Sequence, residues 1–359
     1  EEFELNHEIL GGEIIRRELA GLLSGIRRNP NSRLEEGEEL SVDEIVMLIT
    51  RPKTANAGKF PDDESPDDES PDDESPDDGA PRWLRFLRSL FSGLYTVDNM
   101  DFVLRDAYMS GYSARSFDLD RLLHYSSFTS SGLTIHERGL AALVRFIAVR
   151  SELFQAIYFH RTVRAIDLRL QELFAKSKKL LFPGNPLDDL AAYQRLTEWS
   201  ILVRVANWEQ SSNEQLQELG RQWQGLLRRE VPWKMACQRT IFFRPYEPEG
   251  SSVFSSERAF EAAMRDNLPK HLQDIPMRVD TARHVHRPGA HTPTAGQNFL
   301  YDPASDEIRN LDDRELFRQI PISCRICRVY ARNGEYDREI AAAMDKLLQK
   351  GGADDVTNM

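Results

Sequence analysis

Apolar residues recur at helical spacing through most of the first 210 residues. The spacing predicts helices near residues 9–26, 83–91, 98–112, 118–127, 135–178 and 188–208. Two capping boxes, SVDE at 41–44 and TIHE at 134–137, predict the start of a further helix and of the longest one. A proline- and glycine-rich segment at 183–186 separates the last two helices.

The pattern changes beyond about residue 230. Short runs of β-branched and aromatic residues predict strands at 240–243, 277–280, 298–301 and 324–331, with helices near 256–267 and 336–348. The expected fold is therefore mainly α, with a helical body at residues 1–210 and a smaller C-terminal α+β lobe at 211–359.

One acidic segment interrupts the body. Residues 61–78 repeat the unit PDDES and hold eleven acidic residues without a Lys or Arg. A segment with dense like charge and recurrent proline cannot bury enough surface to fold, which predicts a disordered insertion at 61–80. The alternative is an acidic lure for a basic partner. Without the insertion, the net charge of -12 becomes -12 + 11 = -1, so a nucleic-acid partner is not expected.

The composition narrows the class of protein. No apolar run approaches the roughly 20 residues that span a bilayer, and the first residues, EEFEL, do not form a signal peptide. Three cysteines, Cys237, Cys324 and Cys327, are typical of a reducing compartment. We expect a cytoplasmic protein without a membrane partner.

Residues 97–106, VDNMDFVLRD, carry the first candidate chemistry. On a helix, Asp98, Asp101, Phe102 and Arg105 share one face. Carboxylates and a guanidinium on one face indicate either a ligand or an exposed ion pair between Asp101 and Arg105. Periodicity alone leaves both interpretations open.

A second charged face lies in residues 150–161. Arg150, Phe154, Tyr158 and Arg161 fall at i, i+4, i+8 and i+11 of the expected helix. Two guanidiniums can grip a triphosphate, and a tyrosine can stack on or bond to a sugar and base. The alternative is a helix whose arginines extend past an apolar stripe into water.

The first stretch resembles the D-x-x-D-[YF]-x-x-R-D segment of HD-superfamily deoxynucleoside triphosphate triphosphohydrolases. The resemblance implies that Asp98 is a metal ligand and that Asp106 binds the sugar 3′-hydroxyl. Asn99 stands where the family often has a phosphate-contacting lysine. Phe102 replaces the usual tyrosine beside the sugar.

Two further matches follow the family order. His7 opens HEILGGEII, which is similar to the family's H-E-x-x-[SG]-x-x-[IM]-[IM] helix, whose histidine assists beside the reacting phosphate. Residues 150–161 resemble R-x7-Y-x-H-[RK], which implies substrate contacts by Arg150, Phe154, Tyr158, His160 and Arg161. A weaker match, at 187–198, concerns a mostly structural helix.

The chain also departs from the family. It contains no His-Asp dipeptide, and the family's metal histidine and HD doublet would precede His7. We expect the remaining ligands of a divalent metal (Mn, Mg, Fe or Zn) upstream of residue 1, in a longer protein. The resemblance implies hydrolysis of a dNTP to deoxynucleoside and tripolyphosphate by a homo-oligomer, with His7 and Asp98 catalytic and this chain inactive alone. The alternatives are a non-catalytic nucleotide-binding or scaffold protein and an HD phosphohydrolase acting on another phosphoester.

Two pairs of possible zinc ligands have simpler explanations. Cys324 and Cys327 have zinc-like spacing but fall in an expected strand, where positions i and i+3 point to opposite faces. His284 and His286 would share a face, and we interpret their spacing as coincidence.

Overall fold

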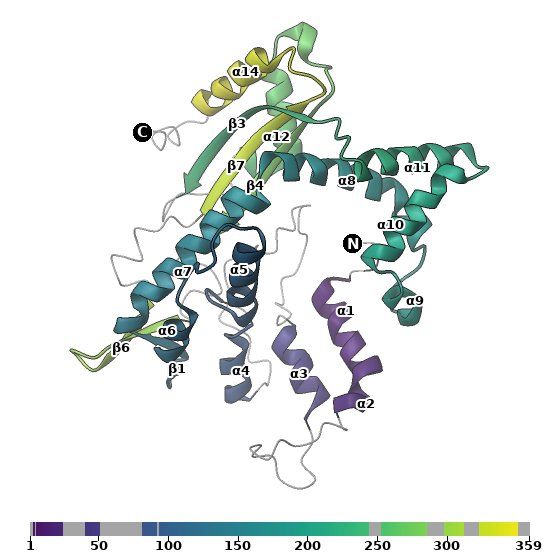
Figure 1. Ribbon diagram of the computed structural model, residues 1–359. Coiled ribbons are helices and arrows are strands. Elements are labelled where there is room, and N and C mark those ends of the chain that lie inside the picture. The colour runs from purple at the N-terminus through teal and green to yellow at the C-terminus, as the bar shows by residue number, and fades with distance from the viewer. Residues whose placement is uncertain are drawn as a thin grey trace.

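The structure is a computed structural model. It describes residues 3, 5–23, 40–50, 81–91, 93–243, 253–285, 298–311 and 323–350. The acidic insertion predicted at 61–80 lies outside these residues. The described chain is mostly helical with two small sheets, which confirms the predicted fold class (Figure 1).

The N-terminal helices form a short layered unit. Its elements are α1 (His7–Ile14), the π-helix η1 (Ile15–Leu19), α2 (Ala20–Leu23), α3 (Val42–Ile49) and α4 (Arg82–Arg88). Ser41 caps α3 by accepting a hydrogen bond from the Glu44 amide, as the capping box predicted. Helix α1 lies against α3 at Gly12, where an added Cβ would meet the Val46 side chain at 3.0 Å.

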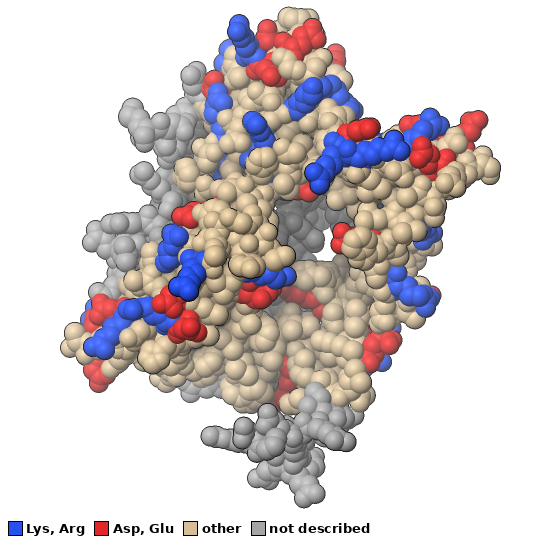
Figure 2. Space-filling model, in the orientation of Figure 1, with Lys and Arg blue, Asp and Glu red and all other residues tan. Residues whose placement is uncertain are grey.

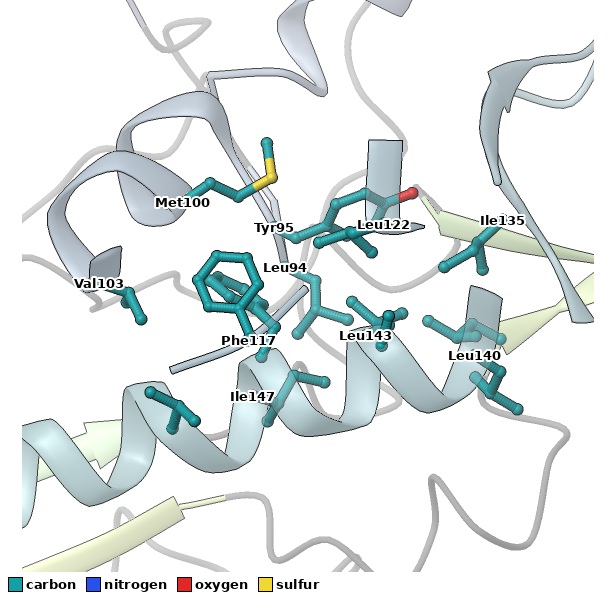
Figure 3. Packing of buried hydrophobic residues seen from close by; sticks show 14 of the residues in the cluster. Leu94, Tyr95, Met100, Val103, Phe117, Leu122, Ile135, Leu140, Leu143 and Ile147 are labelled. Atoms are coloured by element: carbon teal, nitrogen blue, oxygen red, sulfur yellow. The ribbon is translucent and has the colours of Figure 1, made fainter. Parts of the chain in front are cut away.

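The core of the body lies between α5 and α7. It uses α5 (Val97–Met109), α6 (Leu119–His124), β1 (Ser126–Phe128), β2 (Leu133–His136), the 3-10 turn η2 (Glu137–Gly139) and α7 (Leu140–Leu153). Figure 3 shows Leu140, Leu143 and Ile147 of α7 directed into the same cluster as Met100 and Val103 of α5. Burial of these side chains, at roughly 1.5–3 kcal/mol each, holds the two helices together.

The longest predicted helix, 135–178, differs from the structure at its start and in its middle. Thr134 lies in β2 and does not cap a helix, so the expectation of a helix from residue 135 is wrong. β1 and β2 pair in antiparallel register, Ser126 with Ile135 and Phe128 with Leu133, which also contradicts an almost wholly helical body. In its middle, the helix breaks after the π-helix η3 (Phe154–Tyr158), and α8 begins only at Arg161 (Arg161–Leu181).

A helical arm follows α8. It comprises α9 (Leu190–Gln194), α10 (Glu198–Asn207), the 3-10 turn η4 (Trp208–Gln210) and α11 (Glu214–Leu227). Trp223 and Leu173 are buried where α11 and α10 pack on α8. Gly220 is required there, because an added Cβ would lie 2.3 Å from the backbone nitrogen of Glu209.

The lobe is a three-stranded antiparallel sheet in the order β3–β7–β4. Its elements are β3 (Lys234–Phe243), the 3-10 turns η6 (Val253–Ser255) and η7 (Lys270–Leu272), α12 (Glu257–Asn267), β4 (Met277–Val285), β7 (Ser323–Ala331) and α14 (Asp337–Lys350). Helices α12 and α14 bury one face of the sheet, and the start of α8 lies on the other (Figure 1). The strand and helix predictions in this region are confirmed.

Packing crosses the predicted boundary at residue 210. Strand β5 (Asn298–Asp302) pairs in parallel with β2, and β6 (Glu307–Asn310) continues that sheet in the order β1–β2–β5–β6. Leu300 and Leu311 are buried in the α5–α7 core. Helix α11, beyond the boundary, likewise packs on α8 of the body.

Candidate functional site

Helix α5 divides its predicted charged face between two environments. Thr96 caps the helix by accepting from the Asn99 amide at 3.1 Å, and Met100, Val103 and Ala107 turn into the core. Asp101 and Arg105 form an exposed ion pair at 3.2 Å, with side chains 66% and 59% exposed. The ion-pair interpretation is therefore confirmed for these two residues, and only the flank holding Phe102 and Asp106 faces the protein.

Tyr158 joins that flank to the end of α7. Its hydroxyl donates a hydrogen bond to Asp106 Oδ2. The rings of Phe102, Phe154 and Tyr158 meet edge to face, with centroids 5.0 Å apart for Phe154–Tyr158 and 6.2 Å apart for the two pairs with Phe102. Two phenylalanine rings thus pack beside the tyrosine that makes the phenol–carboxylate hydrogen bond.

The surroundings of Tyr158 keep its phenol protonated. Burial is the largest cause that raises the Tyr158 pKa, followed by the hydrogen bond to Asp106 and the negative charge of that carboxylate. Arg105 opposes the shift. Tyr158 therefore remains a donor at neutral pH, and Asp106 Oδ1 accepts no hydrogen bond from the described residues.

Arg150 and His284 lie on the Phe154 side of these rings. Arg150 is only 8% exposed, and its guanidinium carbon is 5.8 Å from the Phe154 ring centroid. His284 of β4 stacks on Phe154, with centroids 4.1 Å apart and planes inclined by 19°. The set Phe102, Asp106, Arg150, Phe154 and Tyr158 is called the Tyr158 cluster below.

The structure does not bring every predicted residue to this cluster. The π-helix and the break at Phe159 and His160 end the helical phase, so the single face predicted to extend from Arg150 to Arg161 is wrong beyond Tyr158. Arg161 is exposed at the first turn of α8. His160 caps that helix, its Nδ1 accepting from the Thr162 amide at 3.3 Å.

His7 lies at the start of α1. Its side chain is exposed, and Asn6 caps the helix by accepting from the Ile9 amide at 2.8 Å. Within the described chain, His7 forms no hydrogen bond or ion pair with the Tyr158 cluster. Helix α1 instead packs on α3, and Arg17 of η1 donates to the Leu187 carbonyl at 2.9 Å.

Asp98 and Asn99 occupy the first turn of α5. Asp98 is exposed and Asn99 is half-buried. Asp98 lies about two turns before Asp106 along α5 and roughly 80° from it around the helix axis.

The residues that the structure describes do not fit a tightly held catalytic metal. No group of three or more His, Cys, Asp or Glu side chains among them could hold an ion. Cys324 and Cys327 are buried in β7, with Cys327 in the core beneath α12 and α14. Asp98 alone cannot supply the several ligands that such a site needs.

A separate cavity lies in the arm. It measures about 500 Å³ and is lined by residues between Leu181 and Arg204, including Asp188, Asp189 and Arg195. It coincides with the weak family match at 187–198 and not with the Tyr158 cluster. The Arg204 side chain is held there by the carbonyls of Leu180 and Leu181, at 2.7 and 2.8 Å.

Charge on the surface is mixed. Figure 2 shows basic and acidic side chains interspersed over the visible face, with basic side chains following α8. None of the described helices is both long and apolar enough to cross a membrane.

No family model matches the chain. It is 26% identical over 215 residues to the uncharacterized protein YwfO of Bacillus subtilis, and 28% identical over 127 residues to the uncharacterized protein MJ1154 of Methanocaldococcus jannaschii. These matches cover 56% and 32% of the chain, but only 47% and 28% of the two relatives.

A crystal structure of a hypothetical protein from Aquifex aeolicus has a similar fold. The TM-score is 0.52 at 19% identity, over 72% of this chain and 60% of that one. At this level of identity the similarity concerns the fold alone.

Proposed function

We propose that the Tyr158 cluster binds the sugar of a deoxynucleoside triphosphate. The observation that carries the proposal is the Tyr158–Asp106 hydrogen bond, made by a tyrosine whose ring packs against Phe102 and Phe154. It joins two motifs about 50 residues apart that resemble successive motifs of one nucleotide-hydrolysing family.

The chemistry of the cluster suits a sugar. Asp106 Oδ1 can accept a hydrogen bond from a 3′-hydroxyl, while Tyr158 holds the other carboxylate oxygen in place. A half-buried carboxylate discriminates strongly for a hydroxyl, because an analogue without it leaves a buried acceptor unpaired. Phe102 and Phe154 supply apolar contact for the ring atoms of the sugar and base.

Two arginines are the candidates to contact the phosphates, one on each side of the break. Arg150 lies behind Phe154, and Arg161 projects from the N-terminus of the 21-residue helix α8. The N-terminal end of a helix attracts anions through its unpaired amides and its dipole. The family resemblance assigns Arg161 to the phosphates.

We propose that this chain binds the nucleotide without turning it over. The implied reaction, hydrolysis of a dNTP to deoxynucleoside and tripolyphosphate, depends on a divalent metal, which would polarise the phosphate. Asp98 is the one ligand assigned by resemblance, so the catalytic roles of Asp98 and His7 belong to a protein that supplies further ligands. A cytoplasmic location and a homo-oligomer remain predictions that accompany this proposal.

The test is a calorimetric titration of the full chain with dGTP. Tyr158→Phe removes the hydroxyl and should weaken binding about 5- to 30-fold, corresponding to one hydrogen bond of 1–2 kcal/mol. The matched control is Tyr112→Phe, because the Tyr112 hydroxyl also donates to a carboxylate, Glu152, near the same helices. Equal effects of the two substitutions, or no binding by the unaltered chain, would contradict the proposal.

A turnover assay tests the second part. The chain is incubated with dGTP and Mn²⁺ or Mg²⁺, and released tripolyphosphate is measured. We expect none above background. Robust turnover that Asp98→Ala abolishes would show that the chain holds the metal after all.

A further inference from the structure

A polar row crosses the lobe sheet on the face toward α8. Asp280 of β4 is paired in register with Arg328 of the central strand β7, and Arg328 with Gln238 of β3. Asp280 and Arg328 are 0% and 2% exposed. Charged residues are seldom buried to this degree unless they are paired.

Both oxygens of the Asp280 carboxylate are occupied by arginines. Arg164 of α8 donates from Nε to Oδ1 at 2.9 Å, and Arg328 donates from Nη1 to Oδ2 at 3.3 Å. Arg328 Nε also donates to Gln238 Oε1 at 2.8 Å. The set Arg164, Gln238, Asp280 and Arg328 is called the Asp280 network.

The network ends on the backbone of the helix break. Arg328 Nη2 donates to the Phe159 carbonyl at 2.5 Å. The Phe159 amide donates to the Phe154 carbonyl at 2.7 Å, which closes the π-turn. Phe159 itself packs against Ala282 and Ile326 of the same sheet.

Tyr158 and Phe159 therefore contact different parts of the molecule. Tyr158 bonds to Asp106 on α5, while the next residue is held by its carbonyl and its ring against β4 and β7. A π-turn is rare and occurs mostly as a single turn within an α-helix. A contact from outside the helix can fix it.

We infer that Asp280 is a positioning residue for the Tyr158 cluster. It holds Arg164 on α8 and aims Arg328 at the Phe159 carbonyl, which fixes the turn that directs Phe154 and Tyr158 toward α5. The inference rests on the proposed function only for what the positioned residues bind.

Stability alone does not account for the network. A buried ion pair often contributes no more than well-packed apolar side chains of similar volume, because both charges lose their hydration. Geometry does account for it, since the planar guanidinium of Arg328 bonds to a carboxylate, an amide and a carbonyl at once.

The experiment compares Asp280→Asn with Glu172→Gln in the full chain without nucleotide. Glu172 makes a similar link between α8 and β4, accepting from Arg278 Nε at 3.0 Å, but further along the helix. The readout is native-state hydrogen exchange of a peptide covering residues 154–164. We expect exchange about tenfold faster in Asp280→Asn and unchanged within about twofold in Glu172→Gln, each measured equally far below its melting temperature.

A second variant covers the case in which Asp280→Asn does not fold. Arg328→Lys keeps the charge beside Asp280 but loses the fork that reaches the Phe159 carbonyl. It should accelerate exchange at 154–164 with a smaller loss of stability.

The pH at which Tyr158 ionises, measured by the absorbance of tyrosinate, reports whether its side chain keeps its position beside Asp106. Tyr158, identified by the difference from Tyr158→Phe in each background, should ionise at lower pH in Arg328→Lys than in the unaltered chain. Glu172→Gln should leave that ionisation in place.

The outcomes separate this inference from the proposed function. Faster exchange at 154–164 in a chain that binds no dGTP would support the positioning role and contradict the nucleotide site. Exchange and ionisation in Arg328→Lys that match Glu172→Gln would overturn the positioning role, whatever the chain binds.

Discussion

Two tyrosine–carboxylate hydrogen bonds join neighbouring segments near α5 and α7, and their surroundings differ. Tyr158, whose ring packs against Phe102 and Phe154, donates to Asp106, and Tyr112 donates to Glu152 at the surface. Tyr112 is 38% exposed, and the Glu152 side chain is 46% exposed. The same pair of chemical groups is thus present once in a partly dry site and once in water.

The pKa shifts show what this difference means. For Tyr158 the largest cause of the raised pKa is burial, whereas for Tyr112 it is the hydrogen bond itself. Water competes with the Tyr112 bond and screens it, but competes less at Tyr158. Only the Tyr158 pair can therefore discriminate a ligand hydroxyl strongly, and its environment makes it the candidate.

The largest predicted effect concerns the core packing of α7, the helix that carries Glu152 and leads to Tyr158. Phe146 of α7 is 0% exposed and packs against Phe117, with ring centroids 5.0 Å apart. Phe146→Ala should lower the free energy of unfolding by about 3–5 kcal/mol, measured by urea denaturation. Val203→Ala, at a side chain that is 62% exposed, is the control and should change it by less than about 0.5 kcal/mol. A loss below 1 kcal/mol in Phe146→Ala would mean that α7 does not depend on this core.

An intermediate effect separates the two tyrosines by pH. At neutral pH, Tyr158→Phe should cost about 1 kcal/mol of stability and Tyr112→Phe only a few tenths. Because the folded-state pKa of Tyr158 lies above the usual tyrosine value of about 10, its contribution is complete below pH 10 and is lost as the pH rises through the folded value.

Denaturation curves between pH 8 and 11 measure this difference. The unaltered chain and Tyr158→Phe should converge in stability above about pH 10, since only the former exposes an ionising phenol at position 158 on unfolding. A constant gap between them over that range would contradict the buried environment of Tyr158.

The smallest predicted effect concerns the outer flank of α5. Asp101→Ala breaks the exposed ion pair with Arg105 and should lower stability by only a few tenths of a kcal/mol. dGTP affinity should remain within about twofold. A tenfold loss of affinity would place the site on the outer flank and not at Tyr158.

Local patterns predicted most of the elements. Short runs of β-branched and aromatic residues marked β3, β4, β5 and β7, because such side chains favour strands. Ser41 and Ser256 cap α3 and α12 by accepting hydrogen bonds from amides three residues on. Thr134 misled because its capping-box pattern is local, whereas β2 forms through pairing with β1 and with distant β5. No periodicity marked the π-turn.

Some residues of the candidate site were likewise predicted from the sequence, and others were not. Helical spacing and family resemblance led to Phe102, Asp106, Arg150, Phe154 and Tyr158, which the structure brings together. The single helical face predicted from Arg150 to Arg161 is wrong beyond Tyr158, because the spacing assumed one helix. Asp280 was not proposed, and His284 was considered only for zinc. Both lie on one face of β4, which extends beyond the strand predicted at 277–280, and nothing local showed what that face would meet.

The return of β5 to the body has a consequence for biosynthesis. Leu133 of β2 is paired with Asn298, a separation of 298 - 133 = 165 residues, and Leu300 completes the α5–α7 core. A ribosome therefore makes most of the chain before the first core can close. Until then, the edge of β2 stays unpaired in the nascent chain, where other strands can pair with it. The lobe sheet cannot form earlier either, because its central strand β7 follows β5 in the chain.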